Sequence, residues 1–184
     1  MKNAVRALSA AMILGFASSA SIAVDNPATP GLTTSEGSID ITLNIAQGIQ
    51  IQELTNIALD LDGVAAGNDL IGRDTFCVGT VGFAGYKIQF DSATSVTDGF
   101  LLQGSSETLP YNVAFTANTA TGATGVQTNT DGTMTPTYTP NTGYSCVDAA
   151  EHNAQVIVTV PAAVWEAAAD LSYTDTLTIT VSGE

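Results

Sequence analysis

Hydrophobic and polar residues alternate in several short segments of this chain, and the first clear case is residues 38–46 (SIDITLNIA). Large aliphatic side chains occupy every second position there, with polar residues between them. A period of two is typical of a β-strand with one apolar and one polar face. The pattern therefore predicts a strand, and taken alone it favours an ordinary first strand paired within its own chain.

Similar patterns predict strands along the rest of the chain. Residues 116–143 differ, because they hold eleven threonines and few apolar residues, and we expect a long loop or hairpin with a short strand near 134–138. Residues 161–170 begin with proline, are rich in alanine and predict a short helix. Short strands at this spacing indicate an all-β sandwich of the immunoglobulin kind. The predicted strands after residue 46 are 49–51, 57–61, 74–80, 86–90, 100–102, 109–115, 155–160 and 173–181.

The start of the chain has the layout of a secretion signal. Lys2 and Arg6 precede a short apolar run, Ala10–Ala17, and small residues stand before the expected cut at Val24. The apolar run is well short of the ~20 residues that a membrane span needs, so we expect a cleaved signal and no anchor. The expected organisation is a signal peptide (1–23), a flexible leader (24–37), an N-terminal strand (38–47) and one domain (48–184).

Loss of the signal would leave a strongly acidic protein. Arg73 and Lys87 would then face all 18 acidic residues, which gives a formal charge of 2 − 18 = −16. Nucleic acids and anionic membrane surfaces are bound by cationic proteins, so this charge argues against both partners. Membrane insertion is not expected either, because no other apolar segment approaches the length of a span. Solubility of an exported protein is the simpler meaning of the charge.

The chain has two cysteines, Cys77 and Cys146. In an oxidising compartment they are expected to pair with each other. A metal site is the weaker interpretation, because two cysteines and a single histidine without a CxxC motif do not make a zinc site. We therefore expect a disulfide and no metal or other cofactor.

Little in the sequence points to catalysis. The single histidine, His152, lies outside any nucleophile motif such as GxSxG, and we expect it to be a solvated loop residue. The run Asp60-Leu61-Asp62-Gly63, followed by Asn68-Asp69, loosely resembles a calcium loop, but turn formation explains these residues better. We expect Trp165 to fill the core rather than to bind a sugar. The chain is therefore predicted not to be an enzyme.

Several segments together resemble one known family. SIDITLNIAQGIQI (38–51) looks like the start of mature pilins of the chaperone–usher pathway, in particular the archaic, Csu-like branch related to the spore coat U family. FCVGTVGFAGYKIQF (76–90), LPYNVAF (109–115) and YTDTLTITV (173–181) are similar to that family's Cys-containing, central and closing strands.

The resemblance implies an incomplete immunoglobulin-like sandwich that is completed by a donor strand from a neighbouring subunit. It implies assembly with a periplasmic chaperone and an outer-membrane usher, and a head-to-tail extracellular fibre. Many relatives have a cysteine near residues 48–51, which this chain lacks, so its disulfide topology must differ. By position, the donor side chains would be Ile39, Ile41, Leu43 and Ile45, and the acceptor groove would include Leu177, Ile179 and Val181.

Two other functions remain open from the residues. One is a self-complete exported sandwich that binds sugar or calcium, with 38–46 paired to its own last strand. The other is a fibre-tip adhesin, although the chain has room for one domain rather than two.

Overall fold

The computed structural model describes residues 31, 33–35, 37, 39–95, 99–144 and 146–184. The chain divides into two units, residues 1–44 and 45–184, and the strands that the structure assigns all lie in the second. The predicted signal peptide (1–23) and most of the predicted leader (24–37) lie outside the described residues.

The regular secondary structure of the second unit is almost entirely β. Its helical elements are one turn each, η1 (Ala149–Glu151) and α1 (Ala162–Trp165). None of the helices in the described part of the chain has the length and apolar character needed to cross a membrane. The strands are β1 (Gly48–Gln52), β2 (Leu70–Val81), β3 (Tyr86–Ser92), β4 (Phe100–Gln103), β5 (Thr108–Thr116), β6 (Val126–Gln127), β7 (Asn141–Thr142), β8 (Ala154–Val160) and β9 (Leu177–Gly183).

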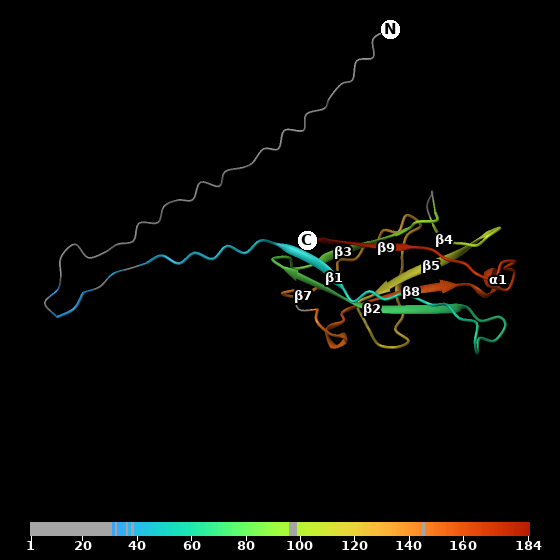
Figure 1. The fold of residues 1–184 in the computed structure, drawn as a ribbon, viewed down its shortest axis with the longest axis horizontal. Coiled ribbons are helices and arrows are strands. Elements are labelled where there is room, and N and C mark those ends of the chain that lie inside the picture. Colours follow the sequence, from blue (N-terminus) through green and yellow to red (C-terminus); the bar gives the residue numbers. More distant parts are fainter. Residues whose placement is uncertain (1–30, 32, 36, 38, 96–98, 145) are drawn as a thin grey trace, which may run out of the picture. The chain divides into compact units, whose positions relative to one another are not determined.

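The strands form two sheets (Figure 1). In the larger sheet the order is β1-β2-β8-β5-β4, with β6 on β5 and β7 on β2. The smaller sheet contains β3 and β9, which run antiparallel with Tyr86 opposite Gly183 and Ser92 opposite Leu177. This all-β, immunoglobulin-like arrangement confirms the predicted fold class.

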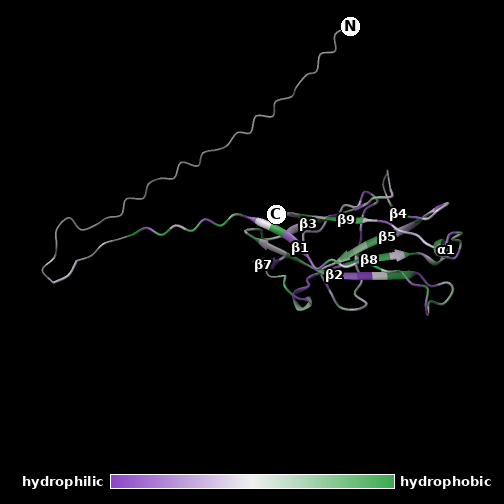
Figure 2. Ribbon diagram, viewed as in Figure 1, coloured by the Kyte–Doolittle hydropathy of each residue, from purple (hydrophilic) through white to green (hydrophobic). Residues whose placement is uncertain are grey.

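The core lies between the two sheets. Phe76, Phe115 and Val156 come from the larger sheet, Phe90 comes from the smaller, and all four are buried. The rings of Phe90 and Phe115 meet across the interior at a centroid distance of 6.1 Å. Figure 2 shows the mostly hydrophobic colouring of β8, a central strand that is buried nearly throughout. The apolar faces that the alternation predicted are thus turned toward one another.

Two predicted strands are not formed within the chain. Residues 39–47 are described but have no strand partner in this structure, which corrects the expectation of an ordinary first strand. Residues 57–61 are also not a strand: Ile57 and Leu59 pack against the core, whereas Leu61 is exposed. Instead these residues form an extended segment that lies over β2. The side chains of Ile57 and Leu59 lie against Gly72, which leaves no room for a side chain at that position.

The threonine-rich region 116–143 is mainly loop, as predicted. It contributes the two-residue strands β6 and β7 and single bridges at Thr133 and Tyr138, in place of a strand at 134–138. Met134 is nevertheless buried in the core, and Tyr138 stacks edge-on against Phe115 at 4.6 Å between ring centroids. This loop therefore closes one side of the domain.

The disulfide Cys77–Cys146 is formed, as predicted. It joins β2 to the loop after β7, and both cysteines are buried. The same loop places the Tyr144 side chain against Gly48, and the Gln50 side-chain amide donates to the Tyr144 carbonyl at 3.1 Å. The loop thereby fixes β1 from the outside of the sandwich.

Candidate strand-acceptor site

The last strand, β9, has one edge without a strand partner in the described residues. Its other edge pairs with β3, and the hydrogen bonds show which residues face each way. Gly85 and Glu184 exchange both backbone bonds, at 3.2 and 2.8 Å. The N–H groups of Tyr86 and Phe90 instead donate away from β9, to Tyr138 and Gly132.

Antiparallel pairs alternate between bonded and non-bonded positions. The bonded pairs therefore continue at 87/182, 89/180 and 91/178 of the β3–β9 register. It follows that the N–H and C=O groups of the remaining β9 residues point to the unpaired edge. These residues are Leu177, Ile179, Val181 and Gly183.

The same residues carry the apolar side chains of β9. Leu177, Ile179 and Val181 pack against the core but are only half-buried, whereas the side chains between them are exposed. The three residues predicted from sequence thus combine free backbone groups with partly covered aliphatic side chains. An added strand that placed an apolar face over them would cover the side chains and pair the backbone.

A second row of half-buried apolar residues belongs to β1 and the segment that follows it. Ile49 and Ile51 lie on β1, Ile57 and Leu59 follow it, and all four pack against the core. β1 is the edge strand of the larger sheet and lies beside β9. We define the acceptor edge as β9 residues 177–183 together with these four residues.

Half of the acceptor edge was missed at the sequence level. The alternation of Ile49 and Ile51 predicts a strand, but it does not say that this strand ends the larger sheet. Ile57 and Leu59 were assigned to a strand of their own. A sequence pattern does not show how the two sheets close on each other, and it is this closure that brings β1 beside β9.

The start of β9 is held by Asp175. Its carboxylate accepts hydrogen bonds from the Tyr111 hydroxyl (2.6 Å), the Ser92 hydroxyl (2.7 Å) and the Thr94 N–H (3.0 Å). Burial acts to raise the pKa of Asp175, but the hydrogen bonds from Tyr111, Ser92 and Thr94 outweigh it and lower the pKa below its ordinary value. The segments LPYNVAF and YTDTLTITV, singled out in the sequence, therefore touch through Tyr111 and Asp175.

A second carboxylate holds the loop that leads into β9. Asp170 accepts from the hydroxyl and N–H of Ser106, both within 2.9 Å, and from the Ser105 hydroxyl at 2.7 Å. Hydrogen bonds from Ser105 and Ser106 lower the pKa of Asp170 to about 2. Glu107 reciprocates by accepting from the Ala169 N–H at 2.6 Å. These contacts join the β4–β5 turn to the loop after α1 and fix where β9 begins.

The predicted donor side chains are exposed. The exposed fractions are 69% for Ile39, 87% for Ile41, 80% for Leu43 and 67% for Ile45. These four side chains therefore form an alternating aliphatic row that is open to solvent in this structure.

The residues considered for other chemistry have structural roles in this fold. His152 is not solvated, which corrects the prediction: its Nδ1 lies 2.8 Å from the Thr75 hydroxyl and its Nε2 2.6 Å from a Glu53 carboxylate oxygen. Trp165 packs against the core and donates its indole N–H to the Asn68 carbonyl at 3.0 Å. The Asp60 carboxylate accepts from the Asp62 N–H at 3.0 Å, as a turn residue does.

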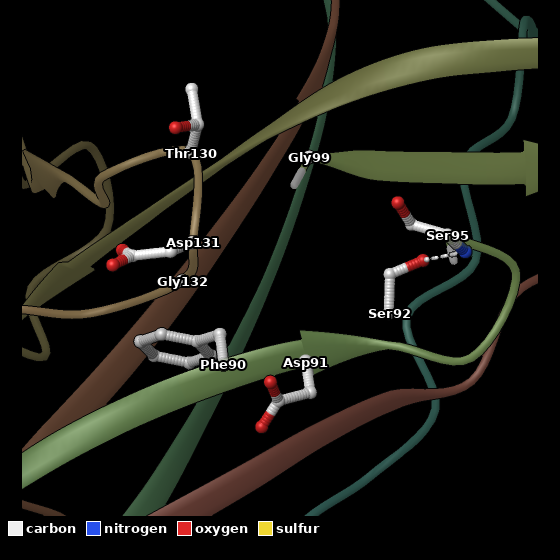
Figure 3. Close-up of a pocket in the computed structure, with 8 residues that line it drawn as sticks. All are labelled: Phe90, Asp91, Ser92, Ser95, Gly99, Thr130, Asp131 and Gly132. Atoms are coloured by element: carbon white, nitrogen blue, oxygen red, sulfur yellow. Dashed lines mark hydrogen bonds between the residues drawn. The ribbon is translucent and has the colours of Figure 1, made fainter. Parts of the chain in front are cut away.

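A small polar hollow lies at the end of β3 (Figure 3). The Asp131 carboxylate accepts from the N–H and the hydroxyl of Thr133, and these bonds lower its pKa. Within the described residues, no group of three or more His, Cys, Asp or Glu side chains is placed to hold a metal ion. The hollow is lined by Phe90, Asp91, Ser92, Ser95, Gly99, Thr130, Asp131 and Gly132.

Comparison with known proteins assigns no family to the chain. No family model matches it, and no curated protein matches it. One similar solved chain comes from a chaperone–tip adhesin complex described as vital for synergistic activation of CFA/I fimbriae biogenesis. The identity is 18%, the TM-score is 0.37, and the match covers 74% of this chain and 42% of that chain. Similarity at this level does not assign a function to this chain.

Proposed function

We propose that this protein is a structural subunit of an exported surface fibre, in which residues 39–45 of one copy complete the sandwich of the next. One observation carries the proposal: the unpaired edge of β9 and the exposed segment match in length and in alternation. The edge offers seven residues, 177–183, with alternate apolar side chains. The segment 39–45 also has seven residues, and its aliphatic side chains are exposed.

The energy of such a contact is sufficient for stable assembly. Burying four large aliphatic side chains contributes about 6–12 kcal/mol before the cost of ordering the segment. Main-chain hydrogen bonds to the free groups of β9 add to this and remove an exposed sheet edge. Because the donor and acceptor surfaces differ, the contact is head-to-tail and repeats as an open filament.

The geometry near β1 favours a second copy over the same chain as the donor. Gly48 of β1 lies opposite Val81, and Gly183 of β9 lies opposite Tyr86, at the other end of the short 82–85 connection. The start of β1 and the end of β9 are therefore at the same end of the domain. To enter the acceptor edge of its own domain, the segment before β1 would have to reverse direction within residues 46–47.

That reversal conflicts with the local sequence. Two-residue hairpin loops use Gly, Asn or Asp, because their backbone needs positive φ, and residues 46–47 are Ala-Gln. The Gln47 side chain is also held, since its amide donates to the Gly82 carbonyl at 2.8 Å. Self-completion is thus disfavoured by turn chemistry.

The proposed assembly route follows from the resemblance to chaperone–usher pilins of the Csu-like branch. A chaperone would cover the acceptor edge in the periplasm, and an outer-membrane usher would mediate exchange for the next subunit. No catalytic activity is part of this proposal.

Deletion of residues 38–46 from the full-length chain tests the proposal. We expect the variant to be exported and folded but to form no filaments by electron microscopy, because the donor is gone while the acceptor remains. Leu43→Asp, which places a charge at a donor position, should have the same effect. Thr42→Asp is the matched control on the polar face and should still assemble. Filaments of normal length from the deletion variant would contradict the proposal.

A further inference from the structure

The exposed segment and the acceptor edge can be aligned residue by residue. The free backbone groups of β9 belong to its odd-numbered residues, 177 to 183, as the β3–β9 hydrogen bonds establish. Side chains opposite each other in an antiparallel pair share a face, so the aliphatic residues of 39–45, also odd-numbered, must lie opposite them. Full overlap of the two seven-residue segments then allows one antiparallel register, in which Ile39 faces Gly183 and Ile45 faces Leu177.

In this register the polar side chains of the two strands are also aligned. Asp40 would lie opposite Ser182, and Ser182 lies opposite Lys87 of β3. Neighbouring strands are about 4.8 Å apart, so the backbones at 40 and 87 would be separated by about 10 Å across a small serine. The long Lys87 side chain and the Asp40 carboxylate can close that gap. The parallel alignment instead places Asp40 in a row with Thr178 and Asp91, which sets two carboxylates on the same side.

Lys87 is suited to receive a carboxylate. In the part of the chain that the structure describes, the one ion pair is His152–Glu53, so the Lys87 ammonium is not neutralised by an acid there. One of its three N–H groups donates to the Thr135 carbonyl at 2.9 Å. Thr135 belongs to the segment that flanks β3 on the edge away from β9, so pairing with Asp40 requires the Lys87 side chain to turn across β3 toward Ser182. Lys87, Gln89, Thr180 and Ser182 line a shallow hollow on that face.

We propose that Lys87 sets the orientation and register of the incoming strand by pairing with Asp40 of the neighbouring copy. The inference rests on the fibre function proposed above and adds the residue pair that selects one alignment. The aliphatic side chains supply most of the binding energy, but they are alike in spacing and tolerate a shift of two residues. A shift of two places Asp40 beside Thr180 and Gln89, away from the ammonium, so the charge pair distinguishes alignments that the apolar face does not.

Zero-length carbodiimide crosslinking of assembled fibres tests the pair directly. Lys87 is the single lysine after residue 2, so amide links from a lysine report on one position. In fibres assembled from a mixture of isotope-labelled and unlabelled copies, we expect Asp40–Lys87 links between labelled and unlabelled chains. Asp40→Asn should remove these links while fibres persist. Fibres in which Lys87 links to a different acid overturn the register and leave the fibre function standing, whereas absence of fibres overturns the fibre function itself.

Charge reversal gives a second, independent measurement. We expect Asp40→Lys and Lys87→Asp each to lower the assembly rate about two- to fivefold at low salt, the size expected of an exposed ion pair, and the double variant to recover it. Asp91→Lys serves as the control at the other end of β3 and should not rescue Lys87→Asp. In a parallel alignment Asp40→Lys would face Asp91 and assemble faster, and that result would overturn the proposal.

Discussion

At the scale of single residues, Asp175 ties the start of β9 to the rest of the sandwich. It is two residues before β9, and its carboxylate joins β3, β5 and the loop after β3 through three hydrogen bonds. The sequence identified Asp175 only as part of a family-like segment. Its partners are 64 to 83 residues away in the chain, so no local pattern could have predicted them.

Replacement of Asp175 by Asn should destabilise the domain. Hydrogen bonds to a charged group contribute about 1.5–3 kcal/mol, and Asn keeps the shape but removes the charge. We expect a loss of this size in the free energy of unfolding at pH 7, measured by chemical denaturation. Asp91→Asn, at an exposed carboxylate of the same sheet, is the control and should change stability little.

The lowered pKa of Asp175 also predicts a pH dependence. Because the folded pKa lies below the unfolded value, the unfolded chain binds the proton more readily as the pH falls through this range. The contribution of Asp175 is therefore present above about pH 4 and is lost as the pH falls through the folded pKa. The Asp175→Asn variant should show a shallower fall in stability from pH 5 to pH 2. Equal slopes for wild type and variant would contradict this assignment.

At the scale of elements, the backbone groups of β9 are divided between its two edges. Even-numbered residues of the strand pair with β3, whereas odd-numbered residues face the free edge. The sequence predicted the strand and its apolar face from the alternation of Leu177, Ile179 and Val181. It could not indicate which edge was free, because that depends on where β3 pairs.

Proline substitutions at neighbouring positions separate the two edges. Thr180→Pro removes an N–H that pairs with β3 and should cost about 1–3 kcal/mol of domain stability, the range for a backbone group left without its partner. Val181→Pro removes an N–H on the free edge, so the domain should unfold at nearly the wild-type denaturant concentration but fail to assemble. Denaturation and electron microscopy of the same preparations give both measurements. Equal destabilisation by the two prolines would show that the assignment is wrong, that is, that even-numbered β9 residues do not pair with β3 while odd-numbered ones face the free edge.

At the scale of the whole molecule, the disulfide joins β2 to the loop that lies against the edge strand β1. Cys77 and Cys146 are 69 positions apart in sequence, and the loop before Cys146 lies against β1 through Tyr144 and Gly48. The pairing was predicted from composition and expected compartment alone. The contact with β1 was not, because it depends on a threonine-rich loop without a regular pattern.

Loss of this disulfide should destabilise the whole domain. Chain entropy for a closed loop of this length predicts up to about 4 kcal/mol, and about 2–4 kcal/mol is typical. We expect the denaturation midpoint of the full chain to fall on reduction and on replacing both cysteines by alanine. The reductant should have no effect on the double alanine variant. An unchanged midpoint in the reduced wild type would contradict the prediction.

The sequence by itself determined the all-β class, the apolar face of most strands and the cysteine pair, since these follow from period-two alternation and from the number of cysteines. It also identified Ile39, Ile41, Leu43 and Ile45 as a coherent row. The alternation alone favoured pairing within the chain, whereas the family resemblance implied donation to a neighbouring subunit. Only the tertiary structure decided which edge stays open and which residues of β1 and the following segment flank it, because sheet pairing is set by contacts between residues far apart in sequence. The tertiary structure also decided that self-pairing would need a reversal at residues 46–47, because it places the start of β1 and the end of β9 at the same end of the domain.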